Sequence, residues 1–171
     1  RYLHPLMDDK QWDAISLRND DIIIVSAIKA GTTWMQTIVA NLIFQSQGLP
    51  GPVMDISPWV ERTRDASEMD EMLRLLEAQS HRRFLKTHLP MDGIPYKADV
   101  SYIYVGRDLR DVFMSLWNHY GNHSELFFEI INNPENLVGE PVPRCPDDIH
   151  EFWKTWSTKG WFSWENDGYP H

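Results

Sequence analysis

The feature that most constrains the fold is an unbroken run of β-branched apolar residues at positions 22–25, Ile-Ile-Ile-Val. A strand that is apolar on both faces is typical of a parallel sheet covered by helices on each side. A short segment with a lysine and a glycine follows, and then an amphipathic pattern predicts a helix over about residues 32–47. We expect Thr32 or Thr33 to be its N-cap and Gly48 to stop it.

The rest of the chain continues this alternation of strand and helix. The patterns predict a helix over residues 66–79, strands over 83–88 and 100–105, a helix over 109–120 and a long loop over 132–146. They also predict a last helix that is capped by Asp147 or Asp148 and carries Phe152, Trp153 and Trp156. Such an order predicts βαβ units, so we expect an α/β fold, a three-layer α/β/α sandwich with a central parallel sheet.

The length of 171 residues predicts a single domain over residues 1–171. Three recognised strands make a thin parallel sheet, and residues 160–171 show no pattern of a closing strand. We therefore expect the fold to be incomplete at the C-terminus and sequence to continue beyond His171.

The composition excludes several classes of function. A net charge of −9 argues against a broad basic face for nucleic acid, so an anionic ligand would need a local positive site. No apolar run reaches the ~18 residues of a membrane span. The start of the chain shows no signal peptide, and its one cysteine, Cys145, is interpreted as a structural thiol. These features favour a cytoplasmic location.

The first candidate site is the loop after the first strand. Gly31 lets the backbone approach a phosphate closely, and the helix N-terminus beyond it offers unpaired N–H groups. Lys29 adds a full charge, and Thr32 and Thr33 add hydroxyl donors. The arrangement is P-loop-like but not a Walker A motif, in which the lysine directly follows the last glycine. The alternative is an ordinary strand–helix turn with a solvated lysine.

Two further candidate sites follow the next two strands. Lys86 and His88 share one face at the end of residues 83–88, and a histidine there can act as a general base, although a structural role is the alternative. Arg107 follows the third strand, and Ser115 lies eight residues on, so the two could hold one phosphate. The alternative for Arg107 is an ion pair with an aspartate at 108 or 111. Because ligands sit beyond the carboxyl ends of parallel strands, we expect all three sites at one sheet edge.

Together these segments resemble the cytosolic sulfotransferase family from about residue 18 onward. The family's 5′-phosphosulfate loop, usually Tyr-Pro-Lys-Ser-Gly-Thr-Thr-Trp, is matched by Lys29, Ala30, Gly31, Thr32, Thr33 and Trp34. Residues 86–90, Lys-Thr-His-Leu-Pro, match its catalytic strand end, and Arg107 with Ser115 matches its 3′-phosphate pair. The usual Tyr-Pro is Ala27-Ile28 here, and the usual serine is Ala30, so we expect altered handling of the donor. The family's C-terminal Arg-Lys-Gly and Gly-Asp-Trp segment does not occur.

The resemblance implies sulfuryl transfer from 3′-phosphoadenosine-5′-phosphosulfate (PAPS) to a hydroxyl or amine of a small-molecule acceptor, leaving adenosine 3′,5′-bisphosphate (PAP), without a metal. It implies that His88 is the base, that Lys29 neutralises the bridging oxygen and that Lys86 holds the sulfuryl oxygens. The implied donor contacts are Lys29, Ala30, Gly31, Thr32 and Thr33 on the 5′-phosphate, Trp34 on the adenine, and Arg107 and Ser115 on the 3′-phosphate.

Several alternatives stay open at this point. One is a P-loop kinase that transfers phosphoryl from ATP, and another is a PAPS-binding relative with impaired catalysis. A homodimer is a further open alternative. Trp59, Tyr120, Phe127 and Phe128 are candidates for an apolar acceptor pocket, each with a plain core role as its alternative.

Overall fold

The computed structural model describes residues 2–135, 137 and 139–160, and our expectation for residues 161–171 lies outside them. The chain divides into two compact units. One unit is Asp9–Gly106, and the other combines Arg1–Asp8 with Arg107–His171. Each unit is described by itself below.

The Asp9–Gly106 unit is built around a three-stranded parallel sheet in the order β4-β3-β5. Strand β3 (Ile22–Ser26) is buried along its whole length between β4 (Phe84–Thr87) and β5 (Ser101–Val105). The three strands start in register, so their carboxyl ends meet at one edge. The predicted strands and their parallel pairing are therefore confirmed.

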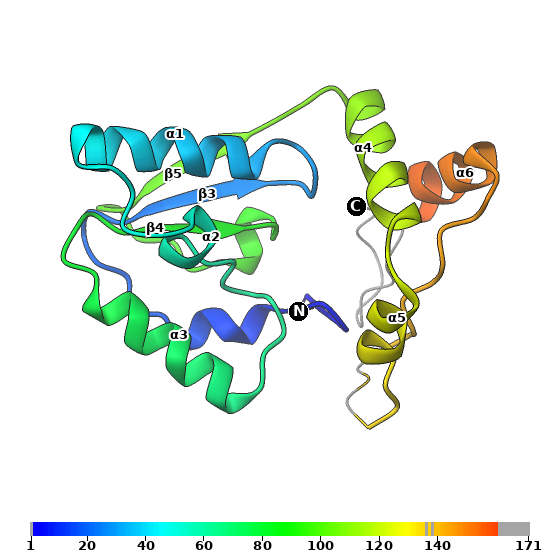
Figure 1. The fold of residues 1–171 in the computed structure, drawn as a ribbon, viewed down its shortest axis with the longest axis horizontal. Coiled ribbons are helices and arrows are strands. Elements are labelled where there is room, and N and C mark those ends of the chain that lie inside the picture. Colours follow the sequence, from blue (N-terminus) through cyan, green and yellow to red (C-terminus); the bar gives the residue numbers. More distant parts are fainter. Residues whose placement is uncertain (1, 136, 138, 161–171) are drawn as a thin grey trace. The chain divides into compact units, whose positions relative to one another are not determined.

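Helices cover both faces of this sheet, as Figure 1 shows. Helix α1 (Thr32–Phe44) lies on one side, and α3 (Ala66–Ala78) lies on the other with the 3₁₀ helix η1 (Asp9–Ala14). The apolar cluster under α1 joins the sheet to α1 and to the short helix α2 (Val53–Ile56), through Ile22, Ile24, Phe84, Val39, Ala40 and Ile56. The expected three-layer arrangement is confirmed in this unit.

The ends of α1 differ from the prediction. Its N-cap is Gly31, and neither threonine takes that place, because both already have helical geometry as the first two residues of the helix. The helix ends at Phe44, and a 3₁₀ turn, η2 (Gln45–Gln47), carries the chain to Gly48. Gln45 has φ 48, so the chain leaves the α-helical path there, three residues before the predicted glycine stop.

A buried ion pair anchors the opposite ends of the strands. Asp21 and Arg83 directly precede β3 and β4, and both side chains are almost fully buried. Arg83 donates from Nε to Asp21 Oδ1 at 2.9 Å and from Nη2 to Asp21 Oδ2 at 2.6 Å. This bidentate pair holds the starts of the two strands together, at the edge of the sheet opposite the candidate site residues.

The second unit is mainly helical. Its helices are α4 (Leu109–Gly121), α5 (Glu125–Ile131) and α6 (Ile149–Lys159), and its short antiparallel ribbon pairs β1 (Leu3–His4) with β2 (Met7–Asp8). Asp148 caps α6 by accepting from the His150 N–H, so the predicted cap is confirmed at the second of the two aspartates. Phe152, fully buried, stacks on Phe113 with ring centroids 5.3 Å apart. Helix α5 was not predicted.

One more 3₁₀ turn, η3 (Met91–Gly93), separates β4 from β5.

Among the described residues, no helix combines the length and the apolar character that crossing a bilayer requires.

Candidate functional site

The loop between β3 and α1 has an unusual backbone. Lys29 has φ 66 and Gly31 has φ 116, so two of its residues adopt the left-handed region, which costs a non-glycine residue about 1 kcal/mol. The Ala30 N–H donates to the Ala27 carbonyl at 3.1 Å and closes the turn. Loops that mix left- and right-handed residues turn successive N–H groups into one concavity that suits an anion. The loop leads into a 13-residue helix whose N-cap makes no side-chain capping bond.

Two buried hydroxyls join this loop to the sheet. Ser26 Oγ at the end of β3 and Thr32 Oγ1 at the start of α1 are 2.6 Å apart. This bond brings the helix N-terminus directly over the carboxyl end of the central strand. Thr33 is exposed, and Trp34 is 80% exposed on the first turn of α1.

The end of β4 pairs with a neighbouring segment that sequence patterns did not predict. The Lys86 N–H donates to the Pro58 carbonyl at 3.1 Å, and the Val60 N–H donates to the Lys86 carbonyl at 3.3 Å. Trp59 therefore lies beside Lys86, whose Nζ is 5.3 Å from the centre of its ring. A charged ammonium is attracted to the face of an indole at this range.

His88 is held in one tautomer by the sheet. Its Nδ1 is 2.8 Å from the Ser26 carbonyl oxygen, which can only accept, so Nδ1 carries the proton and Nε2 has the free lone pair. Burial lowers the pKa of His88 to about 4, the bond to Ser26 opposes this, and the charge of Lys86 lowers the pKa further. The imidazole is therefore neutral at neutral pH, with Nε2 able to accept a proton.

Glu61 is a buried side chain beside the candidate site that sequence reasoning missed. It is fully buried and accepts three N–H bonds, from Trp59 Nε1 at 2.6 Å, from the His88 backbone at 2.6 Å and from Trp12 Nε1 at 3.1 Å. Burial raises its pKa, while the bonds from its neighbours lower it. The only signal in the sequence is a lone acidic residue two positions after a tryptophan, which by itself predicts nothing.

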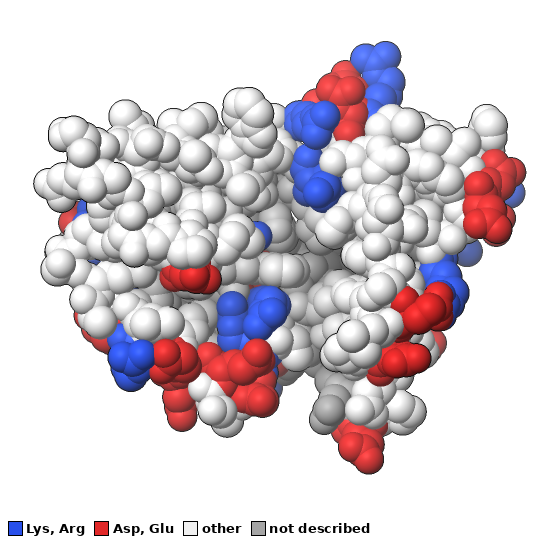
Figure 2. All heavy atoms as spheres, in the orientation of Figure 1, with Lys and Arg blue, Asp and Glu red and all other residues white. Residues whose placement is uncertain are grey.

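The protonation of Lys86 depends on burial and on two neighbouring charges. Burial lowers the pKa of Lys86, the Glu61 charge raises it, and the Lys29 charge lowers it again. A local positive pair thus exists in a chain of net charge −9. On the face in Figure 2, Lys and Arg side chains form small separate groups, with acidic side chains over α3.

Arg107 and Ser115 belong to the second unit. Arg107 Nε is 3.7 Å from Asp111 Oδ2, so the ion pair considered from the sequence does form, and Asp108 pairs with Arg110 instead. Arg107 keeps a side-chain exposure of 41%. Whether this pair shares a ligand with Lys29 and His88 stays a prediction.

The aromatic candidates for an acceptor pocket divide between the units. Trp59 is in the first unit, and its ring meets the His88 ring edge-on at 5.1 Å. Tyr120, Phe127 and Phe128 surround His123 in the second unit. Among the described residues, no cluster of three or more His, Cys, Asp or Glu side chains could hold a metal ion.

Comparisons of the sequence with known proteins identify its family. The family model described as "Sulfotransferase domain" matches residues 19–163. A glycolipid sulfotransferase of Mycobacterium tuberculosis is 44% identical over 124 residues, which are 72% of this chain and 37% of that protein. Sulfotransferase 1A1 of Rattus norvegicus is 33% identical over 123 residues, 68% of this chain and 39% of that protein.

A solved structure shows the same fold. The crystal structure of mouse sulfotransferase SULT7A1 complexed with PAP superposes with a TM-score of 0.57 at 20% identity, over 86% of this chain and 44% of that one. This chain spans less than half the length of each of these relatives. The family model covers most of the chain, and the chain therefore belongs to the sulfotransferase domain family.

Proposed function

We propose that the protein transfers a sulfuryl group from PAPS to a hydroxyl or amine of a small-molecule acceptor. Its two compact units would act as one sulfotransferase domain, because the family match at residues 19–163 spans both. The observation that carries the proposal is the arrangement at the carboxyl end of β3. There the Ser26 carbonyl orients His88, while the Ser26 hydroxyl holds the N-terminus of α1.

The loop residues suit the donor's 5′-phosphate and sulfuryl group. Gly31 and Ala30 would offer backbone N–H groups, Thr32 and Thr33 would bind the phosphate, and Trp34 would stack on the adenine. Thr32 is already bonded to Ser26, so its backbone N–H is better placed for the ligand than its hydroxyl. In the same proposal Arg107 and Ser115 hold the 3′-phosphate.

The reaction is an in-line displacement at sulfur. Nε2 of His88 takes the acceptor's proton as its oxygen or nitrogen forms a bond to sulfur. The bond between sulfur and the bridging oxygen breaks, and the electron pair leaves with the 5′-phosphate of PAP. Lys29 neutralises this leaving oxygen, and Lys86 holds the sulfuryl oxygens, so the protein contributes position and charge.

The relatives and Trp59 support one class of acceptor. Because a relative with 44% identity is a glycolipid sulfotransferase, a lipid-borne hydroxyl is the first acceptor class to test. Trp59 lies against His88 and would form one apolar wall beside the base.

A substitution of His88 tests the proposed base. We expect His88→Ala to lower the transfer rate by about a hundredfold or more, the usual range for loss of a general base, when transfer of labelled sulfate from PAPS is measured. His150→Ala is the matched control, because that side chain is 91% exposed in α6. Unchanged transfer in His88→Ala would contradict the role of His88.

Ligand preference separates this function from the kinase alternative. We expect calorimetry to show binding of PAP and much weaker binding of ATP with Mg²⁺. A preference for ATP with Mg²⁺ would contradict the sulfotransferase proposal. Tight PAP binding without transfer to any acceptor would support the impaired relative instead.

A further inference from the structure

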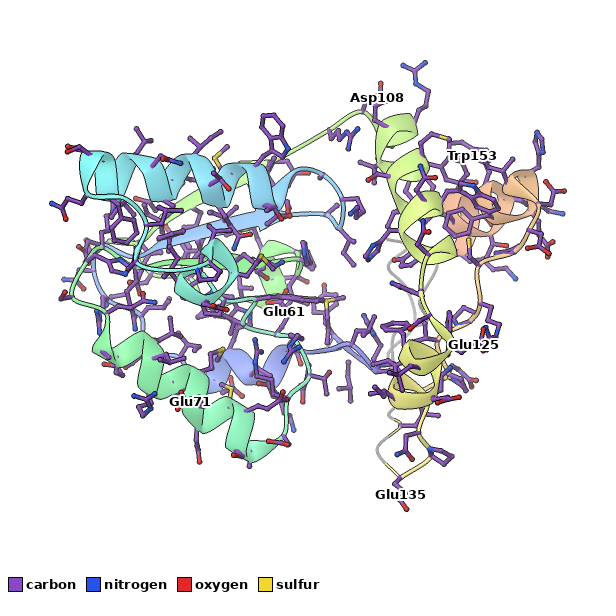
Figure 3. The ribbon with its side chains drawn as sticks, viewed as in Figure 1. Glu61, Glu71, Asp108, Glu125, Glu135 and Trp153 are labelled. Atoms are coloured by element: carbon purple, nitrogen blue, oxygen red, sulfur yellow. The ribbon has the colours of Figure 1, made fainter. Side chains whose placement is uncertain are left out.

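The geometry points to Glu61 as the positioning residue of the site: its buried carboxylate holds Trp59 and His88 in place. This inference rests on the proposed function and adds to it a residue that supports the catalytic groups without touching the substrate. Figure 3 labels Glu61, which is fully buried, and Glu71 on α3, whose side chain is 56% exposed.

The first step of the argument is the bonding of the carboxylate. Glu61 Oε1 accepts from both the Trp59 indole and the His88 backbone, each at 2.6 Å, and Oε2 accepts from the Trp12 indole at 3.1 Å. Burial raises the pKa of Glu61, and the N–H donors aimed at its two oxygens oppose this shift by favouring the ionised form. A buried polar network of this kind fixes the geometry of every group that it joins.

The second step is what these bonds position. Two hydrogen bonds hold His88: its backbone N–H donates to Glu61, and its Nδ1 donates to the Ser26 carbonyl. These two bonds set the direction of Nε2. Trp59, held by the same oxygen, packs edge-on against the His88 ring and under Lys86 Nζ. One carboxylate therefore links the proposed base to the proposed sulfuryl-binding lysine.

The third step is electrostatic. Lys86 is only 6% exposed, and the charged group of Lys29 is close enough to disfavour its protonation. The Glu61 charge acts in the opposite direction and raises the pKa of Lys86. The groups facing Lys86 are thus Glu61 and Trp59 on the segment beside β4, Lys29 from the β3–α1 loop and His88 on its own strand end.

The variant Glu61→Gln separates these effects from mere packing. A glutamine has one acceptor oxygen, so if it keeps the Trp59 and His88 bonds, its amide N–H₂ faces the Trp12 N–H, donor against donor. It also removes the charge that favours protonated Lys86. We expect kcat to fall about tenfold to a hundredfold, as small displacements of catalytic groups commonly cause, with PAP affinity near wild type.

The pH profile gives a readout that a purely structural role would not move. Without the Glu61 charge the pKa of Lys86 falls, so activity that needs protonated Lys86 is lost at a lower pH. We expect the alkaline limb of kcat against pH to shift to lower pH in Glu61→Gln. Glu71→Gln is the matched control, because it removes an exposed charge that pairs with Arg74, and it should change neither kcat nor the alkaline limb.

Proton NMR tests the geometry independently of activity. In the wild type we expect the Trp59 indole and His88 amide protons to resonate far downfield, and both to move upfield in Glu61→Gln. If the wild type transfers no sulfuryl group, the proposed function fails, while the NMR result still decides whether Glu61 holds these two groups. A folded Glu61→Gln variant with unchanged kcat, alkaline limb and NMR shifts would overturn the inference.

A second variant covers the case in which Glu61→Gln does not fold. Trp59→Phe removes one donor to Oε1 but keeps an aromatic ring between His88 and Lys86. We expect a lower kcat and a shifted His88 amide proton, because the remaining bond to Oε1 readjusts. If neither changes, Glu61 is not a positioning residue.

Discussion

The buried pair of Asp21 and Arg83 offers the sharpest test of how the sheet is held. We consider Asp21→Asn, which keeps the shape of the side chain but removes its charge. The side chains of Arg83 and Asp21 are 1% and 0% exposed, so the guanidinium cannot turn to solvent for compensation. Glu77, 3.3 Å from Arg83 Nη1, is itself 64% exposed and a weak substitute.

The expected loss follows from the contacts. Two charge-assisted bonds join the pair, and each contributes about 1.5–3 kcal/mol when its partner is charged. Removing one partner of a buried ion pair costs about 3–5 kcal/mol, because the remaining charge stays buried without compensation. The two estimates agree on a loss of at least about 3 kcal/mol, or about a hundredfold in the unfolding equilibrium.

Urea denaturation measures this free energy of unfolding. The neighbouring Asp20→Asn is the matched control, because its side chain is exposed, and we expect a change within about 0.5 kcal/mol. A loss below about 1 kcal/mol in Asp21→Asn, the level of an exposed ion pair, would refute the reasoning. In that case Arg83 would find its stabilisation in its bond to the Ser16 carbonyl instead.

Two further predictions concern the site. Burial lowers the pKa of His88 from 6.5 to about 4. As the pH falls, the unfolded chain therefore binds a proton at this residue before the folded chain does. The free energy of unfolding should be highest above about pH 6.5 and drop by up to about 3 kcal/mol toward pH 4. His88→Gln should flatten this part of the urea-denaturation profile, and parallel profiles would contradict it. Gly31→Ala should lower the free energy of unfolding by about 1–2 kcal/mol, because alanine is strained at a φ of 116. A clash is not the cause, because the added Cβ would meet Val105 Cγ1 at an ordinary 3.7 Å. Gly121→Ala, with nothing within 4 Å, should cost nothing in the same thermal denaturation assay, and equal losses would show that the left-handed turn is not the cause.

Regular elements were predictable where the pattern is local. The apolar run of β3 predicted a strand buried on both faces, and α1, α3, α4 and α6 begin within a residue or two of their predicted starts. Short elements such as α2 and α5 were missed, because four to seven residues give too little periodicity. The N-cap of α1 was misassigned because glycine competes with threonine there, and only the φ of 116 at Gly31 decides between them.

The residue types of the site and their order could be read from the sequence: a lysine and a glycine after the first strand, a lysine and a histidine after the second. These depend on neighbours in the chain, so patterns could find them. Only the folded chain shows that the Ser26 carbonyl sets the tautomer of His88, and that Glu61 binds both the nearby Trp59 indole and the amide of His88, 27 positions further along the chain. Such bonds depend on backbone groups and on burial, which no local pattern records, because a donor and an acceptor far apart in the chain meet only when the sheet forms.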